Sequence, residues 1–186
     1  MAYRRRQWPD RGEVQPPADP EAAARDICLR QLTLSPKTRA QLAEALARKA
    51  IPDEVAEQVL GRFTEVGLID DEAFAQAWVR SRHNGKGLAP RALSAELRRK
   101  GVDEETVKEA VADLQPEDLD AAARALVARK LASTAGLDPA KRTRRLVGML
   151  ARKGYAPGLA YQVVRDALAE SSSDDDFDSP PPDAPL

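Results

Sequence analysis

The feature that most constrains the fold of this chain is a short block of sequence that occurs three times, roughly fifty residues apart. Each block reads leucine, three residues, leucine, one residue, Arg-Lys, a small residue and an apolar residue. The blocks run from Leu42 to Ile51, from Leu93 to Val102 and from Leu146 to Tyr155. Two leucines four residues apart lie on one stripe of an α-helix. The small residue (Ala50, Gly101, Gly154) then allows a left-handed turn, so each block predicts a helix and its end.

The sequence on either side of each block also has apolar residues at the three- and four-residue spacing of amphipathic helices. A helix is expected before each block, around residues 27–34, 74–79 and 119–131, and another after it. Ser35-Pro36 and the acids Asp70 to Glu72 are expected to begin helices. We therefore predict an all-α fold of about nine helices, arranged as an elongated row of three tandem three-helix repeats over residues 21–69, 70–114 and 115–170.

The two ends of the chain differ from its middle. Residues 1–20 combine arginines with four prolines, and residues 171–186 consist largely of Ser, Asp and Pro. Such segments have little apolar surface to bury, so both are predicted to be disordered. The acidic tail also hides a mildly basic middle behind a net charge of −1. We expect the tail to be solvated, with the alternative that it competes for a basic surface on this protein or on a partner.

Composition excludes several classes of protein. One cysteine and one histidine among 186 residues give no internal disulfide, no Cys-based zinc site and no His-based catalytic or metal centre. No apolar run approaches the length of a membrane span, and no signal peptide opens the chain. We expect a cytoplasmic, monomeric protein that is not an enzyme and has no cofactor.

Single residues with chemical potential have simpler interpretations. The turn Asn84-Gly85-Lys86-Gly87 lacks the other residues of a phosphate-binding loop. His83, beside that turn, is expected to be exposed or to contact a partner. Cys28 lies on an apolar helix stripe, which is typical of a buried, inert thiol. Phe74 and Trp78, one helical turn apart, are predicted to be core residues of the second repeat.

Basic residues are the more informative set. Arg48, Lys49 and their counterparts in the other two blocks can simply complement the helix dipole, and many of the rest fit a solvated face. Together they form a cationic stripe suited to an acidic protein groove or to phosphates. The candidate partner-binding residues in the second and third repeats are Arg80, Arg82, Lys86, Arg91, Arg98, Arg99, Lys100, Lys141, Arg142, Arg145, Arg152 and Lys153.

Three segments of the second repeat strongly resemble the RecX family of bacterial regulatory proteins. They are the stretch from Asp71 through Phe74 and Trp78 to Arg82, the stretch Lys86 to Leu93, and Glu96-Leu97-Arg98-Arg99-Lys100-Gly101-Val102. The resemblance covers about residues 22–170 and is looser in the first and third repeats. It implies an elongated helical protein that docks on the filament of RecA recombinase and single-stranded DNA. It further implies inhibition of the filament's ATP hydrolysis, strand exchange and co-protease activities, in DNA repair and the SOS response.

Two other functions stay open at this point. Short helices joined by tight turns also occur in helix-turn-helix proteins, so the chain could be a helical nucleic-acid-binding module, and weak direct DNA contact would not be surprising. A generic helical-repeat scaffold for another partner is the second alternative. The sequence does not indicate which repeat dominates RecA binding.

Overall fold

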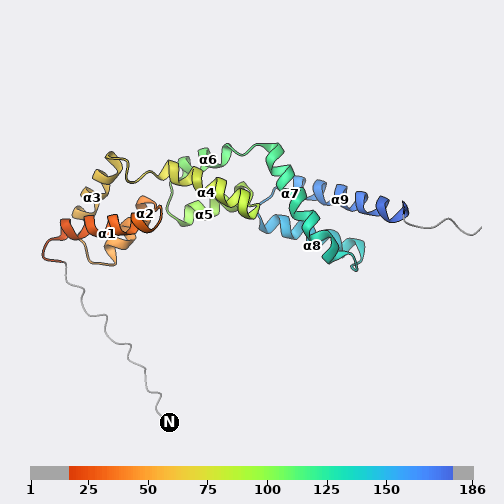
Figure 1. Ribbon diagram of the computed structural model, residues 1–186, viewed down its shortest axis with the longest axis horizontal. Helices are drawn as coiled ribbons and strands as arrows, with labels where there is room; N and C mark the ends of the chain where they lie inside the picture. The colour runs from red at the N-terminus through yellow and green to blue at the C-terminus, as the bar shows by residue number, and fades with distance from the viewer. Residues whose placement is uncertain (1–16, 178–186) are drawn as a thin grey trace, which may run out of the picture. The chain divides into compact units, whose positions relative to one another are not determined.

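The structure is a computed structural model that describes residues 17–177, with side chains described as far as Ser171. Over this range it contains nine α-helices, one short 3₁₀ helix and no strand (Figure 1), which confirms the all-α prediction. In chain order the elements are α1 (Pro20–Leu34), α2 (Arg39–Ala47), α3 (Asp53–Glu65), α4 (Asp71–Lys86), α5 (Pro90–Arg99), α6 (Glu104–Ala112), α7 (Pro116–Leu131), η1 (Ala132–Thr134), α8 (Pro139–Arg152) and α9 (Pro157–Phe177).

The chain divides into two compact units, with the boundary between Phe74 and Ala75 inside α4. The first unit packs α1, α2 and α3 around one core, in which Leu42, Leu46 and Leu60 are fully buried. The first residue of α4 is bound to the start of α2, because the carboxylate of Asp71 accepts a hydrogen bond from the backbone N–H of Arg39 at 2.9 Å.

One helix start in this unit differs from the sequence prediction. Ser35 is the residue at which α1 ends, and it does not begin a helix. The next helix starts at Thr38, whose hydroxyl accepts from the backbone N–H of Gln41 while the Gln41 side chain accepts from the N–H of Thr38. This reciprocal pair satisfies two backbone donors, and a lone Ser-Pro step satisfies fewer.

The second unit holds α5 to α9 and most of α4. Helices α7, α8 and α9 pack on one another around Val127, Leu146, Leu150, Val163 and Val164. Helices α8 and α9 are joined by a short turn and run in opposite directions (Figure 1). Helix α5 packs on α6, where Leu93, Leu97 and Val107 are fully buried.

The three repeated blocks end their helices in the same way. Ala50, Gly101 and Gly154 have φ values of 53°, 79° and 90°. The next residue then donates its N–H to the carbonyl of the second block leucine, as in Ile51 to Leu46, Val102 to Leu97 and Tyr155 to Leu150. This is the Schellman arrangement, with the apolar residue buried over the helix end. The expectation that the small residue closes the helix is therefore confirmed in all three blocks.

The third block also fixes a joint inside the second unit. The N–H of Ala89, at the start of α5, donates to the carbonyl of Lys153 at 2.9 Å. The Lys153 Nζ donates to the carbonyl of Lys86 at 2.6 Å. A Cβ added at Gly154 would lie 2.8 Å from the Cβ of Ala92, so the two backbones approach as closely as glycine allows. Residues 86–92 are thereby held against the end of α8.

Both ends of the described chain are helical where disorder was predicted. Helix α9 continues to Phe177, seven residues into the segment expected to be disordered. Helix α1 begins at Pro20, capped by the Asp19 carboxylate, inside the expected N-terminal arm. The rest of both predicted tails, residues 1–16 and 178–186, lies outside the described residues. No helix in the described part is both long enough and apolar enough to span a membrane.

Candidate functional site

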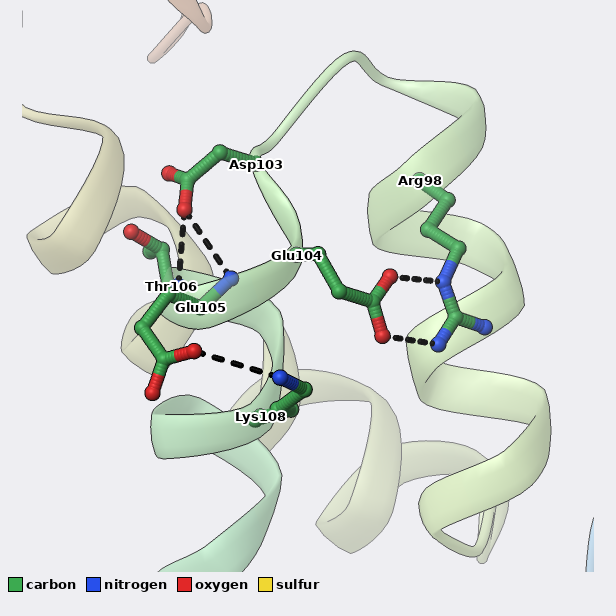
Figure 2. A network of polar contacts seen from close by, with 6 residues as sticks. All are labelled: Arg98, Asp103, Glu104, Glu105, Thr106 and Lys108. Carbon is green, nitrogen blue, oxygen red and sulfur yellow. Dashed lines mark hydrogen bonds and ion pairs between the residues drawn. The ribbon is translucent and has the colours of Figure 1, made fainter.

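Arg98 of the second unit is held by a carboxylate across the α5–α6 turn. Its Nε and one terminal nitrogen each lie 2.7 Å from an oxygen of Glu104 (Figure 2). These hydrogen bonds from Arg98 lower the pKa of Glu104 below its usual value. Asp103 caps α6 in the same network, where hydrogen bonds involving Thr106 lower the pKa of the Asp103 carboxyl. Arg98 therefore orders a turn, and it is less free to meet a partner than its exposure suggests.

Trp78 is partly exposed, so its prediction as a core residue is wrong, whereas Phe74 is buried. The guanidinium carbon of Arg82 lies 4.2 Å from the centre of the Trp78 ring and the ammonium of Lys100 lies 4.0 Å from it. The indole N–H donates to Glu96 at 2.9 Å, and Arg82 forms an ion pair with the same carboxylate. A tryptophan at helical spacing resembles a core residue in sequence, but its face also attracts cations. Two candidate cations are thus gathered on one indole.

The remaining candidates of the second repeat are exposed. Arg80, Lys86 and Arg91 form no ion pair within the part of the chain that the structure describes. Arg99 is also exposed and donates from Nε to the Ala95 carbonyl in its own helix. These four side chains are exposed and have no carboxylate partner among the described residues.

His83 is buried, with only 7% of its surface exposed, so the expectation of an exposed histidine is wrong, and the alternative that it contacts a partner stays a prediction. Its Nδ1 lies 2.9 Å from the Leu88 carbonyl, where it acts as a donor because a carbonyl oxygen only accepts. The ring thereby helps to close the end of α4. A polar ring beside a glycine-rich turn can satisfy the turn's own backbone, which the sequence does not reveal.

The clearest basic site lies in the third repeat, between the end of α7, η1 and α8, and we call it the α8 pocket. It has a volume of about 230 Å³ and is lined by Lys130, Arg145 and Arg152, by the hydroxyl residues Ser133 and Thr134, and by Leu146 and Met149. No acid lines it, and its three cations form no ion pair within the described residues. Arg145 and Arg152 are seven residues apart, two turns of one helix face, as the sequence indicates.

Sequence reasoning missed Lys130 and Ser133. The available signal was the pair Arg129-Lys130 in the last turn of α7, which repeats the Arg-Lys ending of the three blocks. Arg142, a candidate, does not line the pocket, but its Nε donates to the hydroxyl of Thr134, which does, at 3.4 Å. Lys141 is exposed and does not line the pocket.

A second pocket, of about 580 Å³, lies between α4, the end of α6 and α7. The candidate Arg80 lines this pocket, and so do Arg129, Asp113 and Asp118. Because both signs of charge line it, its field is weaker than that of the α8 pocket.

The described residues show no candidate metal centre. No group of three or more His, Cys, Asp or Glu side chains in this part of the chain could hold a metal ion. Cys28 is buried as expected, and burial raises the pKa of its thiol, which keeps it in the unreactive form. The site is thus one of exposed cations, which can bind anionic groups and orient them.

The fold and these surfaces define a class of protein built from tandem three-helix domains. Family models for the first, second and third three-helix domains of RecX match residues 24–63, 70–111 and 117–164. The Regulatory protein RecX of Streptomyces coelicolor is 61% identical over 160 residues, which are 86% of this chain and 85% of that protein. That of Thermobifida fusca is 58% identical over 88% of this chain and 89% of its own length. The chain belongs to the RecX family.

Solved structures give the same fold. The crystal structure of RecX from Lactobacillus salivarius superposes with a TM-score of 0.75 at 17% identity, covering 81% of this chain and 97% of that one. A crystal structure of a regulatory protein RecX gives a TM-score of 0.73 at 26% identity, with 80% and 73% covered. The all-helical arrangement is therefore common to members with little sequence identity. The repeat limits given by the sequence stay a prediction.

Proposed function

We propose that this chain binds the filament of RecA and single-stranded DNA and inhibits its ATP hydrolysis, strand exchange and co-protease activities. It would thereby regulate recombination, DNA repair and the SOS response. The observation that carries the proposal is the 61% identity, over 86% of the chain, to a protein named Regulatory protein RecX. At that level the fold and the surface chemistry of relatives are commonly shared.

The exposed cations of the second unit support the proposal. The cations that line the α8 pocket and Arg91 on α5 have no carboxylate partner among the described residues. Such charges speed and orient docking on an acidic surface more than they add to its final affinity. The candidate residues as a whole stay predictions. Arg82, Arg98 and Lys100 already contact acidic or aromatic side chains of the protein.

The test compares pairs of charge reversals in the full chain, read out as inhibition of RecA ATPase on single-stranded DNA. Arg145→Glu/Arg152→Glu changes α8, and Arg91→Glu/Arg99→Glu changes α5. Arg30→Glu/Lys49→Glu, at exposed positions of the first unit, is the matched control with the same change in charge. We expect each test pair to weaken inhibition by about tenfold or more and the control to leave it nearly unchanged.

The possible results separate the two parts of the proposal. If the unmodified chain at saturation does not alter RecA ATPase, the function is wrong. If the control pair weakens inhibition as much as the test pairs, the function stands and the site is wrong. Equal loss from both test pairs indicates docking through both repeats.

A second candidate function is direct binding of single-stranded DNA, favoured by the absence of acids from the lining of the α8 pocket. It predicts binding without RecA whose affinity falls steeply with salt, with a log–log slope of about −0.7 for each phosphate contacted. Anisotropy of a labelled oligonucleotide at several salt concentrations measures this. A shallow slope would exclude DNA as the main ligand.

A further inference from the structure

The α8 pocket gathers positive charge that nothing in the described part of the chain neutralises. Lys130 comes from α7, and Arg145 and Arg152 lie two turns apart on α8. Like charges brought together repel one another unless an anion or solvent offsets them. The hydroxyl residues Ser133 and Thr134 also line the pocket. Both hydroxyls donate to backbone carbonyls, Ser133 to that of Lys130 and Thr134 to that of Leu131, so the three cations are the groups that favour a carboxylate or phosphate as occupant.

The chain itself contains a matching anion. After Arg165 there is no further Lys or Arg, whereas Asp174, Asp175, Asp176, Asp178 and Asp183 follow. Helix α9 extends to Phe177, so three of these consecutive aspartates fall in its last turn and no basic residue does. The carbonyl end of a helix is negative, and acids there are unfavourable unless a cation compensates them.

The acidic segment follows a helix that is a neighbour of the pocket helices. Helix α9 packs against both α7 and α8, the two helices that form the pocket walls. It runs opposite to α8, so its last turn lies on the side where α8 begins (Figure 1). Arg145 lies in the middle of α8 and Arg152 at its far end, so the chain after α9 has to run back along α8 to reach them. The nine residues after Phe177 can reach up to about 30 Å when extended. A tethered segment of this length acts at an effective concentration on the order of millimolar, so a weak contact is sufficient for docking.

We propose that the acidic segment after α9, residues 178–186, binds in the α8 pocket of the same chain, with the carboxylates of Asp178 and Asp183 accepting hydrogen bonds from Arg145 and Arg152. An anionic partner that uses this pocket must first displace the segment. The segment then limits binding to partners with a denser negative charge than its own.

The test places a nitroxide spin label on the C-terminal segment of the full chain, through Ser179→Cys. Cys28 is fully buried, so the label reacts at the new cysteine. Paramagnetic broadening of the backbone amide signals of Ser133 and Thr134 reports docking. We expect broadening in low salt and its loss in about 0.5 M salt, where the Debye length is only a few ångström.

Two matched variants assign the contact. Arg145→Gln/Arg152→Gln should lower the ratio of docked to free segment about tenfold, because two charge-assisted contacts are removed. Lys141→Gln/Arg144→Gln removes the same charge from the same helix outside the pocket lining and should leave the broadening in place. No broadening at the pocket in the unmodified chain, or equal loss in both variants, would overturn the proposal.

The displacement is tested on the same labelled chain with a twenty-nucleotide single-stranded oligonucleotide as the anionic probe. We expect the broadening to disappear as the oligonucleotide binds. Broadening that persists in the bound complex would show that segment and polyanion use different surfaces. These outcomes do not depend on RecA, so they are separate from the test of the proposed function.

Discussion

At the scale of single residues, the least satisfied polar group in the described core is the hydroxyl of Tyr155. The side chain is 3% exposed, and its hydroxyl has no hydrogen-bond partner among the described residues. Burial raises the pKa of Tyr155 to about 12, from an ordinary value of 10.0. The aromatic ring is needed to cover the end of α8, whereas the hydroxyl adds a desolvation cost without a bond in return.

Tyr155→Phe is therefore expected to leave stability at pH 7 unchanged or to raise it by about 1 kcal/mol. The pKa of Tyr155 is higher in the folded than in the unfolded protein. The free energy of unfolding of the unmodified protein is therefore independent of this group below pH 10 and falls as pH rises from 10 toward 12. The variant lacks this loss. Urea unfolding of both proteins at pH 7 and pH 11 measures the difference. Tyr161→Phe, at a 59% exposed position, is the control and should change neither value.

At the scale of elements, the repeated block shows which parts of the fold are determined by residues close to one another in the sequence. Its leucines, small residue and final apolar residue all act within ten residues of one another, so their positions predict the helix ends correctly. One departure is Ala50, which adopts a left-handed φ of 53° that glycine occupies in the other two blocks. A side chain in that region costs about 1 kcal/mol or more.

We expect Ala50→Gly to stabilise the first unit by about 1 kcal/mol and Gly101→Ala to destabilise the second by a similar amount. The same exchange three residues earlier, Ala47→Gly, should instead destabilise, because Ala47 has helical geometry. Chemical denaturation of the full chain measures all three. If Ala50→Gly and Ala47→Gly both destabilise, the strain at Ala50 is not what the φ value indicates.

The candidate site was predictable only in part, since its contacts are not local. Residue spacing placed Lys141, Arg145 and Arg152 on one face, and of these only Arg145 and Arg152 line the α8 pocket. It could not show that Glu104 holds Arg98, or that Lys100, twenty-two residues further along the chain, lies over the Trp78 ring. It placed Trp78 in the core because helical spacing records which residues share a face and not how large an opposing surface covers it.

At the scale of the whole molecule, the number of compact units differs from the number of repeated blocks, and one reason lies at the third block. Its closing residues bind the start of α5 through the hydrogen bonds of Ala89 and Lys153 described above, so the chain beyond Phe74 forms one unit. A glycine with a left-handed φ ends a helix whether or not another segment lies beside it. The close approach of a second segment is therefore a separate requirement. Gly154 is therefore required both for its φ of 90° and for the space beside Ala92.

Gly154→Ala should consequently cost more than a left-handed residue alone, at least about 3 kcal/mol, because the added methyl also separates α5 from α8. Gly67→Ala is the matched control: Gly67 has a φ of 72° with nothing within 4 Å of an added Cβ, so only the conformational cost of about 1 kcal/mol applies. Urea unfolding of the full chain gives the two losses. Hydrogen exchange then locates the damage, since the Ala89 amide, bonded to the Lys153 carbonyl, should lose protection in Gly154→Ala and keep it in Gly67→Ala. Equal losses, or an Ala89 amide that stays protected in Gly154→Ala, would mean that the joint is not held at this contact.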